Sequence, residues 1–270
     1  MKPSFLFFFI MLLMGLWACQ NQEETPAPNP LEGLTKIVSA EATTLGLQVA
    51  LWGEASPSVG YQELYFSVTD DEGKAAREVR VSITPMMQMM AHAHSCPYEA
   101  LASDRPAINL FRFGMAFMMP SGDMGSWYID VEVKDLATQA SETVRLPLEV
   151  TAPAEARLKS FESAIDASKI FVSIAAPKRP SVGINDFEIV IHRRNTMMDF
   201  PAVEDFTVEI TPEMPTMGHG SPNNVNPVHQ QNGHYRGKVN FTMTGLWRLH
   251  LVIKKGGVVV KDDLFFDMTF

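Results

Sequence analysis

Cysteine is nearly absent from this 270-residue chain, which has only Cys19 and Cys96. Two cysteines are too few for the disulfide framework that holds a small secreted domain together. Basic side chains are also in short supply: 22 Lys and Arg stand against 31 Asp and Glu, which gives a net charge of −9. This acidic balance argues against nucleic acid as a partner, because a polyanion is bound through clusters of positive charge.

The chain also lacks a long hydrophobic run. Its longest, residues 5–17, is shorter than the about 20 residues that span a bilayer. This run follows Lys2 and ends just before Cys19, a pattern typical of a bacterial lipoprotein signal. We expect residues 1–18 to be a signal peptide and Cys19 to be the lipidation site. A retained transmembrane anchor is the alternative.

The segment after the signal is rich in proline and polar residues, so residues 19–32 are expected to be a lipidated tether. This arrangement predicts a protein of the cell envelope, bound to the membrane through its lipid. The outer membrane is favoured, with the body facing either the periplasm or the cell exterior.

Sequence motifs of catalysis are missing as well. The chain has no nucleophile elbow, no phosphate-binding loop and no His-Glu-x-x-His motif. Its carboxylates show no pairing that would indicate acid–base catalysis. We therefore expect that the protein is not an enzyme.

No stretch after the tether has a helical period, whereas short runs rich in β-branched and aromatic residues recur between turn residues. These runs are residues 48–52, 63–69, 78–84, 109–118, 127–133 and 143–150. Many short strands at this spacing are typical of β-sandwiches.

An internal repeat indicates two such sandwiches. Val-Ser-Ile-Thr-Pro at 81–85 returns as Val-Glu-Ile-Thr-Pro at 208–212, and a Gly-x-Trp follows in both copies, at 125–127 and 245–247. Repeats of this kind mark duplicated structural units. We predict a first domain over residues 33–152 and a second over 153–270.

Methionine and histidine cluster at the same place in each copy. In the second copy, the segment 212–222 is broken by proline and glycine, which predicts a surface loop. Thioether and imidazole ligands together select copper, above all Cu(I), and the thiol of the first copy adds to this, with zinc as the second choice. The candidate ligands are Met214, Met217, His219, His229 and His234 in the second copy, and Met87, Met90, His92, His94 and Cys96 in the first.

Some neighbours of these clusters have a simpler explanation. Met119 and Met243 follow alternating strand patterns, which favours core packing over metal binding. His192 and His250 each lie close to basic residues on an expected polar face, and we expect them to be solvated.

The second copy resembles the YtkA-like/FixH family of extracytoplasmic domains. The resemblance covers residues 155–268 and is carried by Met-Pro-Thr-Met-Gly-His-Gly at 214–220, by 233–243 and by Gly-Leu-Trp at 245–247. It implies an immunoglobulin-like fold and a link to copper handling or to the maturation of haem–copper oxidases. The first copy looks like a divergent member, with Ala91 in place of a glycine.

These features together predict a lipid-anchored copper carrier, buffer or chaperone that passes its metal to a receiving protein. The main alternative is a non-catalytic interaction module of the cell envelope, in which the Met-rich loops contact a protein partner, since methionine surfaces suit adaptable binding. Recognition of carbohydrate is a third possibility, which the four tryptophans support only weakly.

Overall fold

The computed structural model describes residues 29–76, 78–102 and 110–270. The expected signal peptide, Cys19 and most of the tether lie outside these residues. All the helices and strands assigned within the described residues are β-strands, so none of these residues forms a helix that could cross a membrane. The expected all-β class is confirmed.

The first domain consists of two antiparallel sheets that face each other. One has the strand order β1-β2-β3-β6 and the other β5-β4-β7-β8. The strands are β1 (Thr35–Ala42), β2 (Leu47–Gly53), β3 (Gly60–Thr69), β4 (Val79–Gln88), β5 (Ala93–His94), β6 (Phe111–Phe117), β7 (Ser126–Asp135) and β8 (Ser141–Leu148).

The second domain repeats this plan, with sheets in the order β14-β15-β11-β10-β9 and β13-β12-β16-β17. Its strands are β9 (Leu158–Glu162), β10 (Lys169–Ala176), β11 (Gly183–Arg194), β12 (Phe206–Met214), β13 (His219–Gly220), β14 (Val225–His229), β15 (His234–Phe241), β16 (Leu246–Lys255) and β17 (Val258–Thr269).

The strand order is that of an immunoglobulin-like sandwich. In the second domain, β10, β11, β15 and β14 take the places of strands A, B, E and D, while β12, β16 and β17 take those of C, F and G. In the first domain β2, β3, β6 and β4, β7, β8 correspond in the same way. Each domain has one added edge strand beside strand A, namely β1 or β9.

Each sandwich has its own hydrophobic core, built by strands whose inward and outward residues alternate. In strand F of each domain every second side chain is buried. These buried residues begin with a tryptophan in both copies: Trp127, Ile129, Val131 and Val133 in β7, and Trp247, Leu249, Leu251 and Ile253 in β16.

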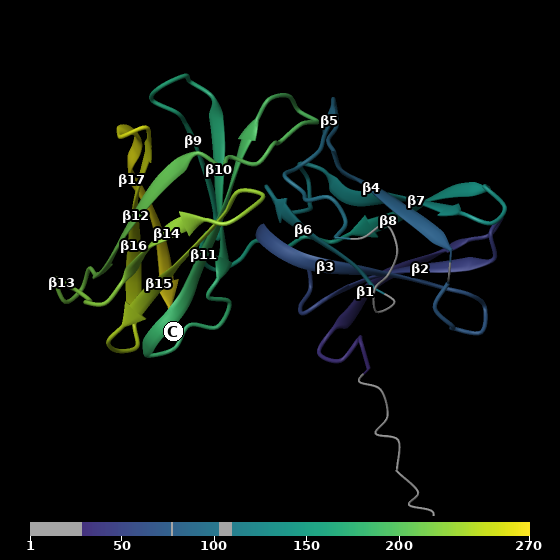
Figure 1. The fold of residues 1–270 in the computed structure, drawn as a ribbon, viewed down its shortest axis with the longest axis horizontal. Coiled ribbons are helices and arrows are strands. Elements are labelled where there is room, and N and C mark those ends of the chain that lie inside the picture. The colour runs from purple at the N-terminus through teal and green to yellow at the C-terminus, as the bar shows by residue number, and fades with distance from the viewer. Residues whose placement is uncertain (1–28, 77, 103–109) are drawn as a thin grey trace, which may run out of the picture.

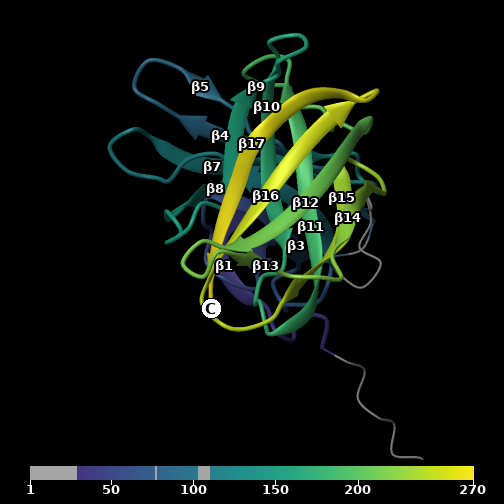
Figure 2. The same ribbon diagram turned by 90° about the vertical axis from the view of Figure 1, so that its left-hand side faces the viewer.

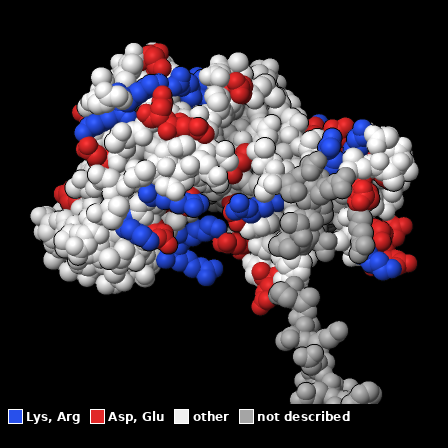
Figure 3. Space-filling model, in the orientation of Figure 1, with Lys and Arg blue, Asp and Glu red and all other residues white. Residues whose placement is uncertain are grey.

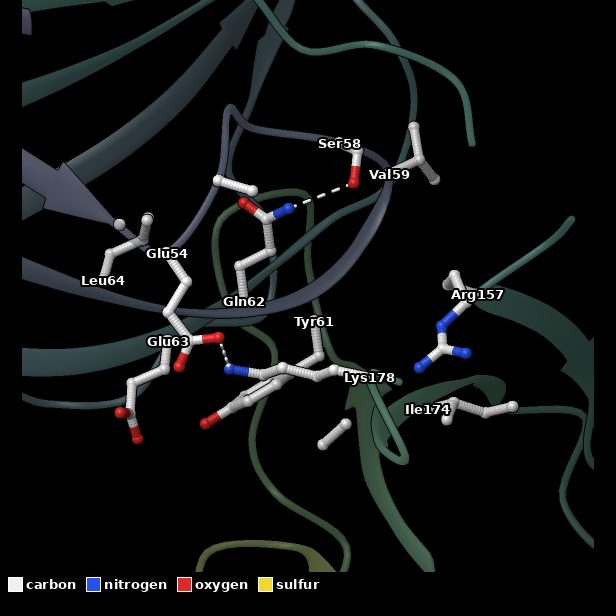
Figure 4. A pocket seen from close by; sticks show the side chains of 13 residues that line it. Glu54, Ser58, Val59, Tyr61, Gln62, Glu63, Leu64, Arg157, Ile174 and Lys178 are labelled. Atoms are coloured by element: carbon white, nitrogen blue, oxygen red, sulfur yellow. Dashed lines mark hydrogen bonds and ion pairs between the residues drawn. The ribbon is translucent and has the colours of Figure 1, made fainter. Parts of the chain in front are cut away.

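The two domains lie side by side and touch along β3 and β10 (Figures 1 and 2). The connecting segment is tied to the first domain by a hydrogen bond from the Val59 amide to the Thr151 carbonyl, at 2.9 Å. Gly60, with φ of +122°, allows the backbones to approach closely, since a Cβ there would lie 2.8 Å from the Cβ of Arg157. A cavity of about 310 Å³ opens beside this contact, where Lys178 of the second domain pairs with Glu54 of the first at 3.0 Å (Figure 4).

Candidate metal centre

The methionine–histidine segment of the second domain is a hairpin at one end of the sandwich. Met214 is the last residue of β12, pairs with His219 of β13 and is only 4% exposed. The amides of Met217 and Gly218 both donate to the Met214 carbonyl, which closes the turn. The expected loop over 212–222 is therefore shorter than predicted. Met214 faces the core, whereas Met217 is 60% exposed on the turn.

Trp247 is the buried floor of this hairpin. Its indole N–H donates to the Met243 carbonyl at 3.0 Å, and its ring lies edge-on to the ring of His219 with centroids 6.1 Å apart. Gly245 has a φ of +126°, which side chains rarely allow, and a Cβ there would lie only 3.0 Å from the Met214 methyl group. Met243 lies beyond the end of β15 and is 41% exposed, so it is not the core residue that the strand pattern favoured.

The imidazole of His219 is held in one tautomer. Its Nδ1 lies 3.0 Å from the Gly220 carbonyl oxygen. A carbonyl only accepts hydrogen bonds, so Nδ1 is the donor, and in the neutral ring this leaves the lone pair on Nε2. No described residue makes a hydrogen bond to this Nε2. This is the arrangement by which proteins orient a histidine that binds metal.

The first domain has the same arrangement around Trp127. Its indole N–H donates to the Met119 carbonyl at 2.8 Å, and its ring lies edge-on to His94 at 5.9 Å. His94 pairs across the hairpin with Met87, as His219 does with Met214, and its Nδ1 lies 2.7 Å from the Ser95 carbonyl oxygen. The structural counterpart of His219 is therefore His94. His92, which matches at a constant sequence offset, lies in a turn that is longer by two residues.

The two hairpins differ in exposure. In the first domain Met87 and His94 are 0% and 4% exposed, and Met119 packs partly against the core. Met90 is 96% exposed at the tip, where His92 is also exposed. The second hairpin offers its histidine more openly, since His219 is only partly buried.

Two of the candidate histidines are not brought to the second hairpin. His229 pairs with Tyr235, and His234 begins β15, whereas the hairpin contacts the opposite end of that strand through Ser221 and Asn240. Strand residues rise by about 3.3 Å each, so these histidines lie well outside coordination distance. His229 lies 4.0 Å from Glu204, and both ring nitrogens of His234 are occupied by carboxylates.

His234 forms an ionic bridge between the domains. Its Nδ1 lies 2.6 Å from Glu188 of the second domain and its Nε2 lies 2.6 Å from Glu99 of the first. Tyr61 donates to Glu99, and Arg236 donates to Glu188. Burial opposes the charge on His234, but the two carboxylates outweigh this effect and raise its pKa to about 9.

Cys96 and His192 lie at the same interface between the two domains. Cys96 is fully buried, and burial raises the pKa of its thiol. His192 is 4% exposed, so the expectation that it is solvated is wrong. Its burial lowers its pKa to about 4, which leaves the imidazole neutral. His250 is partly buried and lies 2.8 Å from Glu213. No pattern in the sequence pointed to Glu99, Glu188 or His192.

No group of three or more His, Cys, Asp or Glu side chains that could hold a metal ion occurs among the described residues. Methionine thioethers are outside that set of ligands.

Comparison with solved structures gives weak likenesses to several bacterial proteins. The Escherichia coli adhesin FdeC is 9% identical, with 89% of this chain and 83% of that chain covered and a TM-score of 0.26. Yersinia pseudotuberculosis InvD is 11% identical, with 88% and 57% covered and a TM-score of 0.25. The integrin-binding protein invasin is 13% identical, with 83% and 39% covered and a TM-score of 0.24. None of the curated proteins matches the chain.

A family comparison matches residues 166–252, which run from just before β10 into β16. The matched region contains the whole second hairpin together with Met243 and Trp247. The family is the YtkA-like one, as the resemblance of residues 155–268 predicted. Residues 166–252 of the second domain are thus a YtkA-like region.

Proposed function

We propose that this protein is a lipid-anchored, extracytoplasmic copper-binding protein that carries, buffers or delivers Cu(I). The observation that carries the proposal is the duplicated hairpin, in which a histidine with a free Nε2 lies against a buried tryptophan and among methionines. His219 has this role in the second domain and His94 in the first.

The chemistry of the second hairpin fits a soft, monovalent ion. Met217 lies on the same turn as His219, and the Met243 carbonyl accepts from the tryptophan against which His219 packs; both methionines are exposed. A thioether competes poorly with water for a hard ion but binds Cu(I) well. The lobe that bears β13 shows no charged side chain on the face seen in Figure 3. Thioether and imidazole ligands are neutral, so they do not neutralise the charge of the ion. We expect such a site to release copper to a receiving protein more readily than a site with thiolate ligands.

An anaerobic Cu(I) competition titration tests the proposal. We expect wild-type protein to bind Cu(I) more tightly than Cu(II), and His219→Ala to lose one equivalent because it removes the only nitrogen ligand of the hairpin. His94→Ala should remove a separate equivalent, whereas His92→Ala should retain it.

His250→Ala is the matched control, because His250 lies on the neighbouring strand and pairs with Glu213 instead. Equal loss in His219→Ala and His250→Ala would mean that copper binds non-specifically. If wild type does not compete even with a weak chelator, the copper proposal fails.

The exposed methionines also support a second candidate, an interaction module that docks a protein partner. Met90 and Met217, in the turns of the two hairpins, are 96% and 60% exposed, and Met124, in the segment before β7, is 60% exposed. Flexible methionine side chains adapt to a partner surface. If this second function is correct, Met217→Ser should weaken binding of the partner protein, and copper should not change that binding.

Anchoring is the cellular side of the proposal and depends on Cys19, which lies outside the described residues. Cys19→Ala should move the protein from the membrane fraction to a soluble or unprocessed form, because the acyl chains supply the membrane affinity. Fractionation and mass spectrometry of the native protein measure this. An unmodified Cys19, or a retained Met1, would show that the anchor is wrong.

A further inference from the structure

A cavity of about 390 Å³ lies between the two domains, and its wall begins two residues after His94 of the first hairpin. Residues from both domains form its walls. Those that matter here are Cys96, Tyr98 and Glu99 from the first domain and His192, Met198 and Phe200 from the second.

His192 is the unusual member of this cavity wall. It is 4% exposed, and its ring makes no hydrogen bond to any described residue. Its backbone pairs with Phe171 and Ala202, which holds its side chain on the face of β11 that borders the cavity. The imidazole is therefore open to a ligand bound in the cavity.

Two sulfur atoms belong to the same cavity wall. Cys96 contributes a thiol from a fully buried position in the first domain. Met198 contributes a thioether from the loop after β11, which the Asn195 amide closes onto Asp199 at 3.0 Å. The loop is tied to the first domain by a hydrogen bond from the Ser95 amide to the Met197 carbonyl, at 2.9 Å. Met198 and Cys96 are thus each one residue from a direct contact between the domains.

We propose that Cys96, His192 and Met198 form a third site for a soft monovalent metal, Cu(I), which joins the two domains. Thiolate, imidazole and thioether are the donors that copper selects. On binding, the Cys96 S–H bond breaks, a sulfur–copper bond forms and one proton is released to solvent, with no change in oxidation state. His192 gives up no proton, because it already has a free lone pair. The site shares no ligand with the hairpin sites proposed above, but Cys96 lies two residues from His94, so variants without the hairpin histidines are needed to test it separately.

Cu(I) fits this cavity better than Zn²⁺. A structural zinc site usually needs four ligands from Cys, His, Asp or Glu side chains. The described residues contain no cluster of three such side chains, here or elsewhere. Only a metal that accepts a thioether completes a three-coordinate site with Cys96 and His192.

The test is an anaerobic Cu(I) titration of the full-length protein in detergent, with His94→Ala and His219→Ala both present to remove the hairpin sites. We expect ultraviolet charge-transfer absorption from a copper–thiolate bond that saturates at one equivalent. Cys96→Ser should abolish this absorption. Met198→Leu and His192→Phe should each weaken binding at least tenfold, as expected when one of three ligands is lost.

Met197→Leu is the matched control, because Met197 is the neighbouring exposed methionine and is not part of the cavity wall. Thermal unfolding of each metal-free variant checks that the fold survives, and Met198→Leu at the partly exposed loop keeps the test valid if Cys96→Ser unfolds. Absence of the thiolate absorption, or equal affinity in the Met197 and Met198 variants, would overturn this site. If Cys96→Ser in otherwise wild-type protein still binds the two copper equivalents of the hairpins, the proposed function stands without this third site. Stronger binding of Zn²⁺ than of Cu(I) would overturn the choice of metal.

Discussion

Trp247→Ala should unfold the second domain under conditions in which the first stays folded. Trp247 is completely buried at the start of the inward-facing row of β16, in a core that shares no residue with that of the first domain. Truncating a buried tryptophan to alanine costs about 3–5 kcal/mol, because transfer free energy is lost and a cavity remains. The substitution also removes the hydrogen bond from the indole to Met243. This loss is a large part of the 5–15 kcal/mol that stabilises a typical domain.

Urea unfolding followed by circular dichroism measures this effect. In Trp247→Ala, the unfolding transition of the second domain should move to a lower urea concentration than in wild type. It should then be separate from the transition of the first domain. Trp127→Ala is the matched variant, because Trp127 has the same place in the first domain. It should destabilise the other transition. A single transition that shifts equally in both variants would show that the two sandwiches unfold as one unit.

The same substitution connects the fold to the proposed metal site. The ring of Trp247 is the surface on which His219 rests, and its N–H positions the Met243 backbone. Trp247→Phe keeps most of the apolar volume but loses the N–H, so we expect a folded domain with weakened Cu(I) binding at the second hairpin only. Unchanged affinity in Trp247→Phe would mean that the tryptophan serves the core and not the site.

The β-sandwich plan was predictable because it follows from local patterns. Alternating residues set the faces of β7 and β16, and the repeat of Gly-x-Trp set the correspondence between the domains. The correct histidine partner was not predictable in the same way. Cross-strand pairing fixes His94 opposite Met87, as His219 lies opposite Met214, and the longer first turn shifts this pairing relative to a constant sequence offset.

The contacts at the interface between the two domains could not be predicted from the sequence, for a different reason. His192 precedes two arginines, and local polarity suggested a solvated face. The structure buries it where β11 pairs with Ala202 of the following segment and borders the cavity between the domains. Glu99 and His234 are far apart in the sequence but meet at 2.6 Å. Contacts of this kind depend on how two finished sandwiches dock, which no periodicity within one strand records.

His234 should make the stability of the protein depend on pH above neutrality. Its pKa is about 9 in the folded protein against 6.5 for a free histidine. A raised pKa means that the contribution to stability is complete below pH 6.5 and is lost as the pH rises through about 9. The difference corresponds to roughly 3 kcal/mol for this side chain, which is 9% exposed. The charged groups that face it are Glu99, Glu188, Arg236 and, when ionised, Tyr61 and His192.

His234→Gln separates this contribution from the rest of the protein. Glutamine keeps a hydrogen-bonding side chain but cannot carry charge, so Glu99 and Glu188 would face each other across the boundary without a cation. Removing one partner of a buried charge cluster costs about 3–5 kcal/mol. The variant should therefore be less stable than wild type at pH 6.5, and its free energy of unfolding should fall less steeply between pH 6.5 and about 9.

Arg236→Gln is the control, because its more exposed ion pair with Glu188 should contribute at most about 1 kcal/mol. Parallel pH profiles for wild type and His234→Gln would show that His234 is not charged in the folded protein. The link between the domains would then rest on the Lys178–Glu54 ion pair, on apolar contact and on backbone hydrogen bonds.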